Sequence, residues 1–412
     1  MTRQNRSRQT YTRKPNLTDV QAVGHDTLRL VNRRILLSLI SDRQPISRAD
    51  IARISGLNKA TVSTIMNELL RERCVIEEGL GNTTPSGGKP PTPLRINELR
   101  FGIFGLDVRA DETILALADF NSRIVARHSF KTGADPQALF RQLGKEIRKL
   151  RREHGEFDEA AGVGVSLPGL VDNHRGTFLM SVVLPWGEAP VRAWLEAATG
   201  LPVIVDSSAR CAALAEIWHG KARYAHMRNL LFVSVSSGLS CGLVIDGGLY
   251  RGGHNTAGQF GHMPIDLNGE RCRCGLRGCW DLYASDNATL ARYRQIHGKG
   301  NGRAVTMRRL VEMVESGDLA AMKAVRETAH YLGVGIAGLV NGLDPEAVII
   351  GGEITKAWGL IEPIITGEVT RNVLDPRARE IPIRRSAFEV RPTLKGALAL
   401  VLNEQLSVPH VG

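Results

Sequence analysis

The residues with the clearest chemical potential are one histidine and three cysteines in the second half of the chain. His262 is followed by Cys272, Cys274 and Cys279, with the spacing H-x9-C-x-C-x4-C. Three thiolates and one imidazole form the tetrahedral set that holds a structural zinc ion and leaves no open position for water. In a cytoplasmic chain, three cysteines within eight residues favour a metal site over disulfides. We therefore predict a Zn²⁺ site that fixes a loop.

A second group of chemistry-bearing residues lies on one face of a helix predicted to follow Asn58 and to reach Arg73. Its inward side is apolar and consists of Val62, Ile65, Met66 and Leu69. Its outward side is small and polar and consists of Ala60, Ser63, Thr64, Asn67 and Arg71. Such a face is slim enough to enter the major groove of DNA and offers hydrogen-bonding groups to base edges.

A hairpin is predicted after this helix, with strands at Val75–Glu77 and Leu94–Ile96 and a Gly/Pro-rich tip that carries Lys89. Lys59, Thr61 and Lys89 are the side chains expected to contact phosphates. Together with a preceding helix from Arg48 to Ile54, these elements predict a winged helix-turn-helix that binds a double-stranded DNA operator. The alternative is an ordinary three-helix packing unit with an exposed polar face.

The charge distribution favours the DNA-binding interpretation. Residues 1–100 contain 17 Lys/Arg and 9 Asp/Glu, whereas the remaining 312 residues contain 36 and 33. The basic excess therefore lies where a polyanion would be bound. No apolar run is long enough to span a bilayer, and the polar, basic start has no secretory signal, so a cytoplasmic location is expected.

The 412 residues are too many for a single core and predict three regions. A basic arm covers residues 1–25, a DNA-binding domain residues 26–97, and a larger effector and oligomerisation domain residues 98–412. The larger domain has an α/β pattern in which a strand-rich start with crossing helices occurs twice. Its expected elements include strands at 101–108, 113–119, 123–130, 160–166, 230–236, 242–245 and 347–350, and helices at 136–154, 207–219 and 324–341. This repetition predicts two similar lobes around a cleft.

At this point the chain resembles the ROK family of repressors and sugar kinases, over roughly residues 26–405. The motifs that carry the resemblance are Gly56-Leu57-Asn58-Lys59-Ala60-Thr61-Val62-Ser63, Ser86-Gly87-Gly88-Lys89-Pro90, Leu167-Pro168-Gly169-Leu170-Val171-Asp172, Gly258-Gln259-Phe260-Gly261-His262, the Cys-x-Cys-Gly-x-x-Gly-Cys run and Ile350-Gly351-Gly352. The resemblance implies a duplicated ribonuclease-H-like fold of the actin, Hsp70 and sugar-kinase class. It also implies a winged helix at the amino terminus, as in the family's repressors.

The parts that a family kinase needs are altered here. In the kinase motif Glu-Asn-Asp-Ala-Asn the Asp is the general base, and the matching position is Ser208, with Ser207 at the sugar-binding Asn. A serine hydroxyl is too weak a base, and loss of a positioned base typically costs ~10²–10⁴-fold in rate. The two phosphate loops are also degraded, to Asp107-Val108-Arg109-Ala110-Asp111 and Ser236-Ser237-Gly238-Leu239-Ser240. We therefore predict no enzymatic activity.

The sugar-binding positions implied by the resemblance keep polar side chains. They correspond to Ser207, Ser208, Gln259, His262 and Asp281. Five polar groups can bind a polyol, with a hydrogen-bond pattern different from that of the kinases. The expected effector is a sugar or a sugar phosphate, and the alternative is a vestigial cleft that binds nothing.

These features predict a transcriptional regulator, a repressor of carbohydrate-utilisation genes. As a homodimer or homotetramer it would bind a near-palindromic operator, and an effector between the lobes would change the spacing of the two winged helices. One alternative is an active ATP-dependent sugar kinase. The other is a regulator controlled by a protein partner instead of a small effector.

Overall fold

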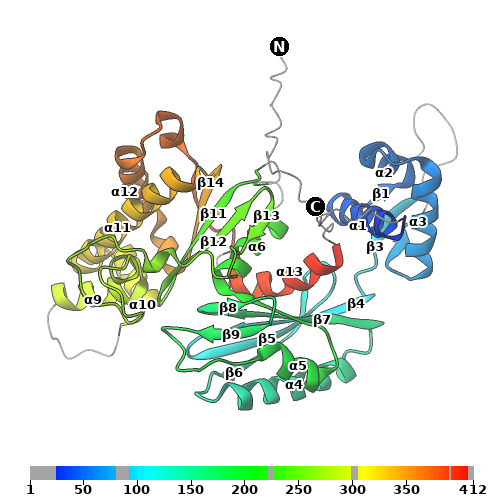
Figure 1. Cartoon of the computed structure of the whole chain (residues 1–412), viewed down its shortest axis with the longest axis horizontal. Helices are drawn as coiled ribbons and strands as arrows, with labels where there is room; N and C mark the ends of the chain where they lie inside the picture. Colours follow the sequence, from blue (N-terminus) through cyan, green and yellow to red (C-terminus); the bar gives the residue numbers. More distant parts are fainter. Residues whose placement is uncertain are drawn as a thin grey trace, which may run out of the picture. The chain divides into compact units, whose positions relative to one another are not determined.

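The computed structural model describes residues 25–79, 92–220, 224, 227–297, 305–388 and 391–406. The chain divides into two compact units (Figure 1). One contains the residues up to Ile96 and those from Gln405 onward, and the other contains Asn97–Glu404. The arm predicted for residues 1–25 and the hairpin tip with Lys89 lie outside the described residues, apart from His25.

The smaller unit consists of three helices and a three-stranded antiparallel sheet. The helices are α1 (His25–Arg43), α2 (Arg48–Ser55) and α3 (Lys59–Arg71), and the strands are β1 (Ile46–Ser47), β2 (Val75–Glu77) and β3 (Pro93–Ile96) in the order β1-β3-β2. Leu36, Ile40, Ile51, Met66 and Leu94 are completely buried in its core. Gly56 ends α2 with φ 73°, a left-handed conformation that favours glycine and permits the sharp turn into α3.

The larger unit contains two five-stranded mixed sheets of identical topology. The first is ordered β10-β7-β4-β5-β6 and comprises β4 (Phe101–Val108), β5 (Glu112–Ala118), β6 (Ile124–Lys131), β7 (Glu159–Leu167) and β10 (Val203–Ser207). The second is ordered β13-β12-β11-β14-β15 and comprises β11 (Leu230–Val235), β12 (Leu239–Ile245), β13 (Gly248–Tyr250), β14 (Ala347–Gly351) and β15 (Ile383–Arg385). In each, the first three strands in chain order are antiparallel and the last two add in parallel. The predicted duplication is confirmed at the level of topology.

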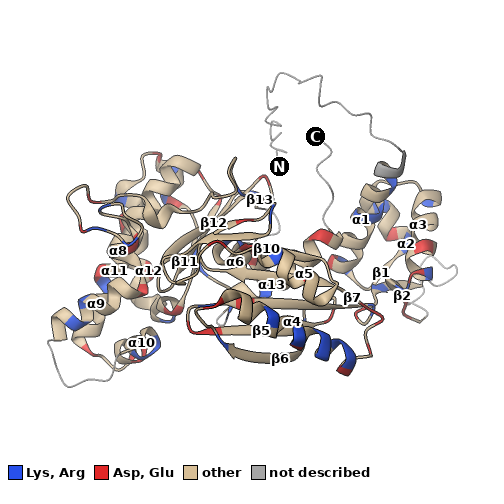
Figure 2. Cartoon of the chain, turned by 60° about the horizontal axis from the view of Figure 1, so that its bottom comes forward, with Lys and Arg blue, Asp and Glu red and all other residues tan. Residues whose placement is uncertain are grey.

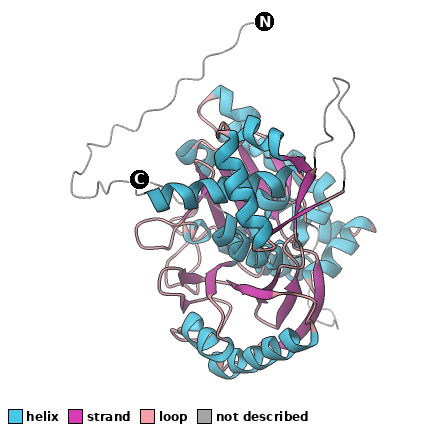
Figure 3. Ribbon diagram, turned by 90° about the vertical axis from the view of Figure 1, so that its right-hand side faces the viewer, coloured by secondary structure: helices cyan, strands magenta, loops and turns pink. Residues whose placement is uncertain are grey.

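Helices and a small ribbon complete the two lobes (Figure 3). The first lobe carries α4 (Pro136–Glu153), α5 (Val191–Thr199) and the two-stranded ribbon β8 (Leu170–Asp172) and β9 (Thr177–Met180). The second carries α8 (Asp281–Ala284), α9 (Asp286–His297), α10 (Met307–Glu315), α11 (Leu319–Leu343) and α12 (Trp358–Asn372), with 3-10 turns at Phe260–His262, Glu353–Ala357 and Pro376–Glu380. None of the described helices is long and apolar enough to cross a membrane.

Two further helices, α6 (Ser208–His219) and α13 (Pro392–Leu406), pack closely against each other and the sheets. A Cβ at Gly396 of α13 would lie 1.8 Å from the Cys211 carbonyl oxygen of α6, so glycine is required at this contact. Gly242 of β12 approaches the Ala209 carbonyl of α6 in the same way, because a Cβ there would lie 2.5 Å from that oxygen. The helices therefore lie in backbone contact, and α6 begins at the end of a first-lobe strand and packs on the second sheet.

Candidate functional site

The exposed face of α3 holds the residues predicted to contact DNA. The Asn58 side chain caps the helix by accepting a hydrogen bond from the Thr61 backbone N–H at 2.8 Å. The four predicted inward residues, Val62, Ile65, Met66 and Leu69, are all buried. Lys59, Ala60, Thr64, Asn67 and Arg71 are exposed, and Thr61 and Ser63 are half-buried.

Arg48 is a residue on this surface that the sequence analysis missed. From the start of α2 it donates a hydrogen bond to Asn67 Oδ1 at 3.0 Å and pairs with Glu77 Oε1 of β2 at 3.3 Å. This bond from Arg48 orients the Asn67 amide, whose NH₂ can donate to an outside acceptor. Only the tertiary arrangement of α2, α3 and β2 brings these three residues together.

The predicted metal ligands converge on one point. The ligand atoms of His262, Cys272, Cys274 and Cys279 all lie within 4.8 Å of one another. His262 Nδ1 is 3.8 Å from Cys272 Sγ, and the Sγ atoms of Cys274 and Cys279 are 3.6 Å apart. Burial raises the pKa of the Cys272 thiol and raises that of Cys279 to about 12, and a divalent cation would offset this cost of ionisation. The donor set therefore fits a metal ion.

The loop that carries these ligands is tied to the core of the second lobe. Gly278, at φ 61°, packs so tightly that a Cβ would lie 1.6 Å from the Asp266 carbonyl oxygen. Trp280, next to Cys279, is completely buried and donates from Nε1 to the Tyr331 carbonyl at 2.7 Å. The cluster and the packed tryptophan thus fix adjacent positions of the chain.

A cavity of about 260 Å³ lies at the first-lobe ribbon, the start of α6 and the metal loop. Four of the five predicted effector residues line it, namely Ser208, Gln259, His262 and Asp281. Ser207 is not among its described lining residues; it is the last residue of β10 and is buried. The lining residues that the sequence analysis did not assign to the effector include Ser181, Ser236, Ser237, Ser240 and Cys274.

The charge of this cavity comes from one carboxylate. Asp281 accepts a hydrogen bond from the Leu239 backbone N–H at 2.5 Å, and burial raises its pKa. None of the described lining residues is Lys or Arg. The cavity can therefore hydrogen-bond hydroxyl groups, but its described lining offers no Lys or Arg to a phosphate or carboxylate; Arg273, whose charge acts on Asp281, is not a lining residue.

A buried ion-pair network lies directly behind Ser207 and Ser208. Asp206 is fully buried and accepts from Arg210 Nε at 2.5 Å and from Arg251 Nη2 at 2.9 Å. Arg210, only 1% exposed, also donates to the carbonyls of Asn255 at 2.8 Å and Val171 at 3.1 Å. These bonds connect β10 with α6, the ribbon and the loop that leads to Gln259, and the last three contribute residues to the cavity wall.

The positions that match phosphate loops in kinases are occupied by paired or acidic side chains. Asp107 is buried and accepts from Arg109 at 3.2 Å and from Arg391 at 3.4 Å. Behind Ser236, the Asp286 backbone N–H donates to the Ser236 carbonyl at 2.8 Å. Burial, together with the nearby Glu353 carboxylate, raises the pKa of Asp286 to about 7.

The two-lobed unit with duplicated mixed sheets has the α/β architecture of the sugar kinases and their non-catalytic relatives. The ROK family model matches residues 103–404, and the chain belongs to the ROK family. It is 30% identical to the xylose repressor of Caldicellulosiruptor bescii, with 94% of this chain and 99% of that protein covered.

Solved structures agree with this assignment. A ROK family transcriptional regulator, a homologue of the Escherichia coli Mlc protein, superposes with a TM-score of 0.79 at 25% identity over 92% of this chain and 98% of that chain. A ROK glucokinase from Streptomyces griseus, in complex with glucose and AMPPNP, gives 0.64 at 25% identity over 73% and 98%. The prediction of a ROK family transcriptional regulator is confirmed.

Proposed function

We propose that the chain represses carbohydrate-utilisation genes by binding an operator through a winged helix-turn-helix, and that a neutral sugar in the cavity controls this binding. The observation that carries the proposal is the exposed polar face of α3 in a unit whose helices and sheet have the helix-turn-helix and wing order. In this proposal residues 1–25 form a basic arm, residues 26–97 the DNA-binding domain, and residues 98–412 the effector and oligomerisation domain.

The recognition helix would read bases with its outward polar face. Ala60, Ser63, Thr64, Asn67 and Arg71 would face the major groove. Lys59 and Thr61 would hold phosphates beside it, and Lys89, on the wing, would add another phosphate or minor-groove contact. Since Arg48 donates to the oxygen of Asn67, it would orient the amide so that the Asn67 NH₂ can donate to a base acceptor.

The volume and the charge of the cavity limit which class of effector it can bind. Sites for drug-sized ligands measure roughly 300–1,000 Å³, and the volume of about 260 Å³ here fits a monosaccharide. Asp281 would repel an anion, and the described wall supplies no compensating cation. The best-supported ligand is therefore an uncharged sugar, held by hydrogen bonds to Ser208, Gln259, His262 and Asp281.

Phosphoryl transfer is not supported by the residues present. Ser208 stands in the cavity where a kinase would need a carboxylate base. Asp206 cannot substitute for it, because its two oxygens are engaged by Arg210 and Arg251 and it is completely buried. The acidic groups beside both former phosphate loops would also disfavour a triphosphate.

The cysteine and histidine cluster would hold Zn²⁺ as a structural ion. Three thiolates and one imidazole complete its coordination shell, and such a closed shell performs no catalysis. Because His262 and Cys274 also line the cavity, the ion would keep one wall of the effector site in place. Assembly into a homodimer or homotetramer would present two recognition helices to a near-palindromic operator.

A gel shift with the DNA upstream of the coding sequence tests the proposal. We expect the affinity for this DNA to fall with rising salt concentration and with addition of a neutral monosaccharide. In Asn67→Ala we expect it to fall about tenfold, since one base contact is worth ~1–3 kcal/mol. Gln295→Ala, which removes an exposed amide from α9, is the matched control and should bind normally.

A coupled assay with ATP and a panel of sugars tests the kinase alternative. Rapid phosphorylation by a protein that ignores duplex DNA would overturn the proposal. Operator binding that no sugar alters, together with no stabilisation by any sugar in thermal-shift assays, would favour control by a protein partner.

A further inference from the structure

The outward face of α4 is strongly basic. Arg141, Lys145, Arg148 and Arg152 follow one another at intervals of four, three and four residues, so they lie along one side of the helix. Figure 2 shows Lys and Arg gathered along α4. The opposite side packs into the first lobe through Leu139, Phe140, Leu143, Ile147 and Leu150. α4 carries six Lys/Arg and two Glu, whereas residues 101–412 as a whole contain 36 Lys/Arg and 33 Asp/Glu. The basic excess of the larger unit is therefore concentrated on this helix.

A hollow of about 660 Å³ lies on this face, and its lining in the described part of the chain consists of Lys145, Arg148, Arg151 and Arg152. Two of these are held in place by the carboxyl end of α5, because Arg148 donates to the Ala198 carbonyl and Arg151 to the Thr199 carbonyl, the latter at 3.3 Å. Among the residues that the structure describes, Arg141, Lys145 and Arg152 form no ion pair, although Lys149 pairs with Glu146 and Glu153. Three cations thus remain uncompensated at the surface.

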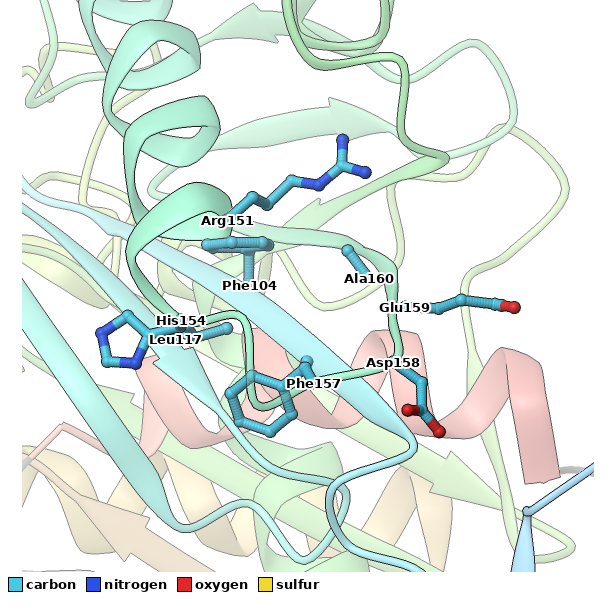
Figure 4. A pocket seen from close by; sticks show the side chains of 9 residues that line it. Phe104, Leu117, Arg151, His154, Phe157, Asp158, Glu159 and Ala160 are labelled. Carbon is cyan, nitrogen blue, oxygen red and sulfur yellow. The ribbon is translucent and has the colours of Figure 1, made fainter.

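The basic face ends at the last turn of α4. Figure 4 shows Arg151 and His154 there beside a separate cavity of about 120 Å³, together with the acidic Asp158 and Glu159 and the ring of Phe157. This mixture of charges and apolar surface does not suit a polyanion. The uncompensated cations therefore define a bounded strip along α4.

We infer that the α4 face is a second DNA-contacting surface, which binds the phosphate backbone without reading sequence. The inference rests on the proposed function, because it adds contacts to a protein that already binds DNA. Protein interfaces have an apolar, often aromatic centre, whereas contacts to phosphates are made by Arg and Lys. The all-cationic lining of the hollow matches the second pattern. The strip presents one cation per ~5.4 Å turn of the helix. A DNA strand carries one phosphate charge per ~3.4 Å of its axis, so each cation along the strip can reach a phosphate.

Counterion release provides the test, because each phosphate contact contributes ~0.9 to the slope of log K against log salt. The probe is a mixed-sequence duplex of about 60 base pairs, bound by the full-length protein and by a variant with Arg141→Gln, Lys145→Gln and Arg152→Gln. The matched control carries Arg294→Gln, Lys323→Gln and Arg326→Gln, which removes from α9 and α11 three exposed cations that form no ion pair with any described residue. We expect the slope to fall by about 2–3 in the α4 variant and to stay unchanged in the control.

Three outcomes would overturn the inference. An unchanged slope in the α4 variant means that its cations do not reach DNA. An equal fall in both variants means that only net charge matters. Should the triple variant unfold, Lys145→Glu alone must lower the slope by about 1, and a normal slope would decide against the α4 face. If the wild-type protein fails to bind any duplex, the proposed function itself is wrong. The assay distinguishes this outcome from a wild-type protein that binds DNA with a slope that the α4 variant leaves unchanged.

Discussion

The loop with the His262, Cys272, Cys274 and Cys279 cluster and the cavity beside Ser208 share His262 and Cys274, yet they are built in opposite ways. The four donors of the metal cluster lie within residues 262–279 and within 4.8 Å of one another. The polar lining of the cavity is spread over residues 181–281 and over separate elements of both lobes. Four donors that together coordinate one ion bind it well only when all four are present. The polar residues that line the cavity would each contribute a small part of the binding energy of a ligand. Removal of one residue should therefore have unequal consequences in the two regions.

The largest effect is expected from Cys279→Ser in the metal loop. In the proposed zinc site, loss of one thiolate would open the coordination shell and free the loop next to the buried Trp280. We expect loss of the bound metal and a fall in melting temperature on the order of 10 °C, since loss of a structural metal is among the most destabilising changes. Metal analysis of the purified protein and thermal unfolding measure both quantities, and a chelator should reproduce the effect in the wild-type protein.

The matched control for this prediction is Cys241→Ala, which alters a buried cysteine outside the metal loop. It should keep a full complement of metal. A Cys279→Ser protein with normal metal content and normal stability would show that the four side chains lie together without holding an ion.

This difference also decides what could be predicted from the sequence. The convergence of His262, Cys272, Cys274 and Cys279 follows from spacing within one short segment, and the buried side of α3 follows from its 3.6-residue period, because both depend on local chain geometry. The strand Phe101–Val108 was predicted with its exact ends for the same reason: its apolar run is bounded by polar turns. Local signals were enough for these elements.

The cavity could be predicted only in part. Its residues were assigned through family resemblance, and that route included Ser207, which does not line the cavity in the described part of the chain, and omitted Ser181, Ser236 and Ser240, which do. No periodicity connects residues that meet only after the lobes fold. The sequence analysis also did not predict the helix α12, because Pro363 lies inside it and proline normally indicates a helix boundary.

An intermediate effect is expected from Asp286→Asn, which tests the acidic group behind Ser236. The pKa of Asp286 is raised to about 7, so the folded protein binds this proton more tightly than the unfolded chain does. Its contribution to stability is present at acidic pH and is lost as the pH rises through 7. Between the ordinary carboxyl pKa of 3.8 and 7 this loss amounts to ~1.36 kcal/mol per pH unit, and it levels off above 7, so the wild-type protein should lose about 2 kcal/mol of unfolding free energy from this group between pH 5 and 7.

Urea unfolding of the metal-loaded protein at the two pH values measures this difference. Asp286→Asn should reduce the pH dependence by about 2 kcal/mol, because the amide does not ionise. Asp111→Asn, at an exposed position, should leave it unchanged. An Asp286→Asn protein with the wild-type pH dependence would show that ionisation of the Asp286 carboxyl group does not cause this loss of stability.

The smallest effect is expected from Ser208→Ala in the cavity. The hydroxyl is one of several hydrogen-bonding groups around the ligand, so its loss should weaken a neutral sugar by about 1 kcal/mol, or roughly fivefold, and leave the melting temperature unchanged. Calorimetry with the monosaccharide that most stabilises the wild-type protein measures this, with Ser316→Ala, an exposed serine of the second lobe, as control. Complete loss of binding would mean that a single group dominates the site, as the metal loop depends on each of its ligands, and the contrast between the two regions would no longer hold. A graded loss, repeated at Ser240→Ala, would instead show that the cavity retains a polyol through many weak contacts, which is what a sensor needs and what a catalytic site with one indispensable base does not have.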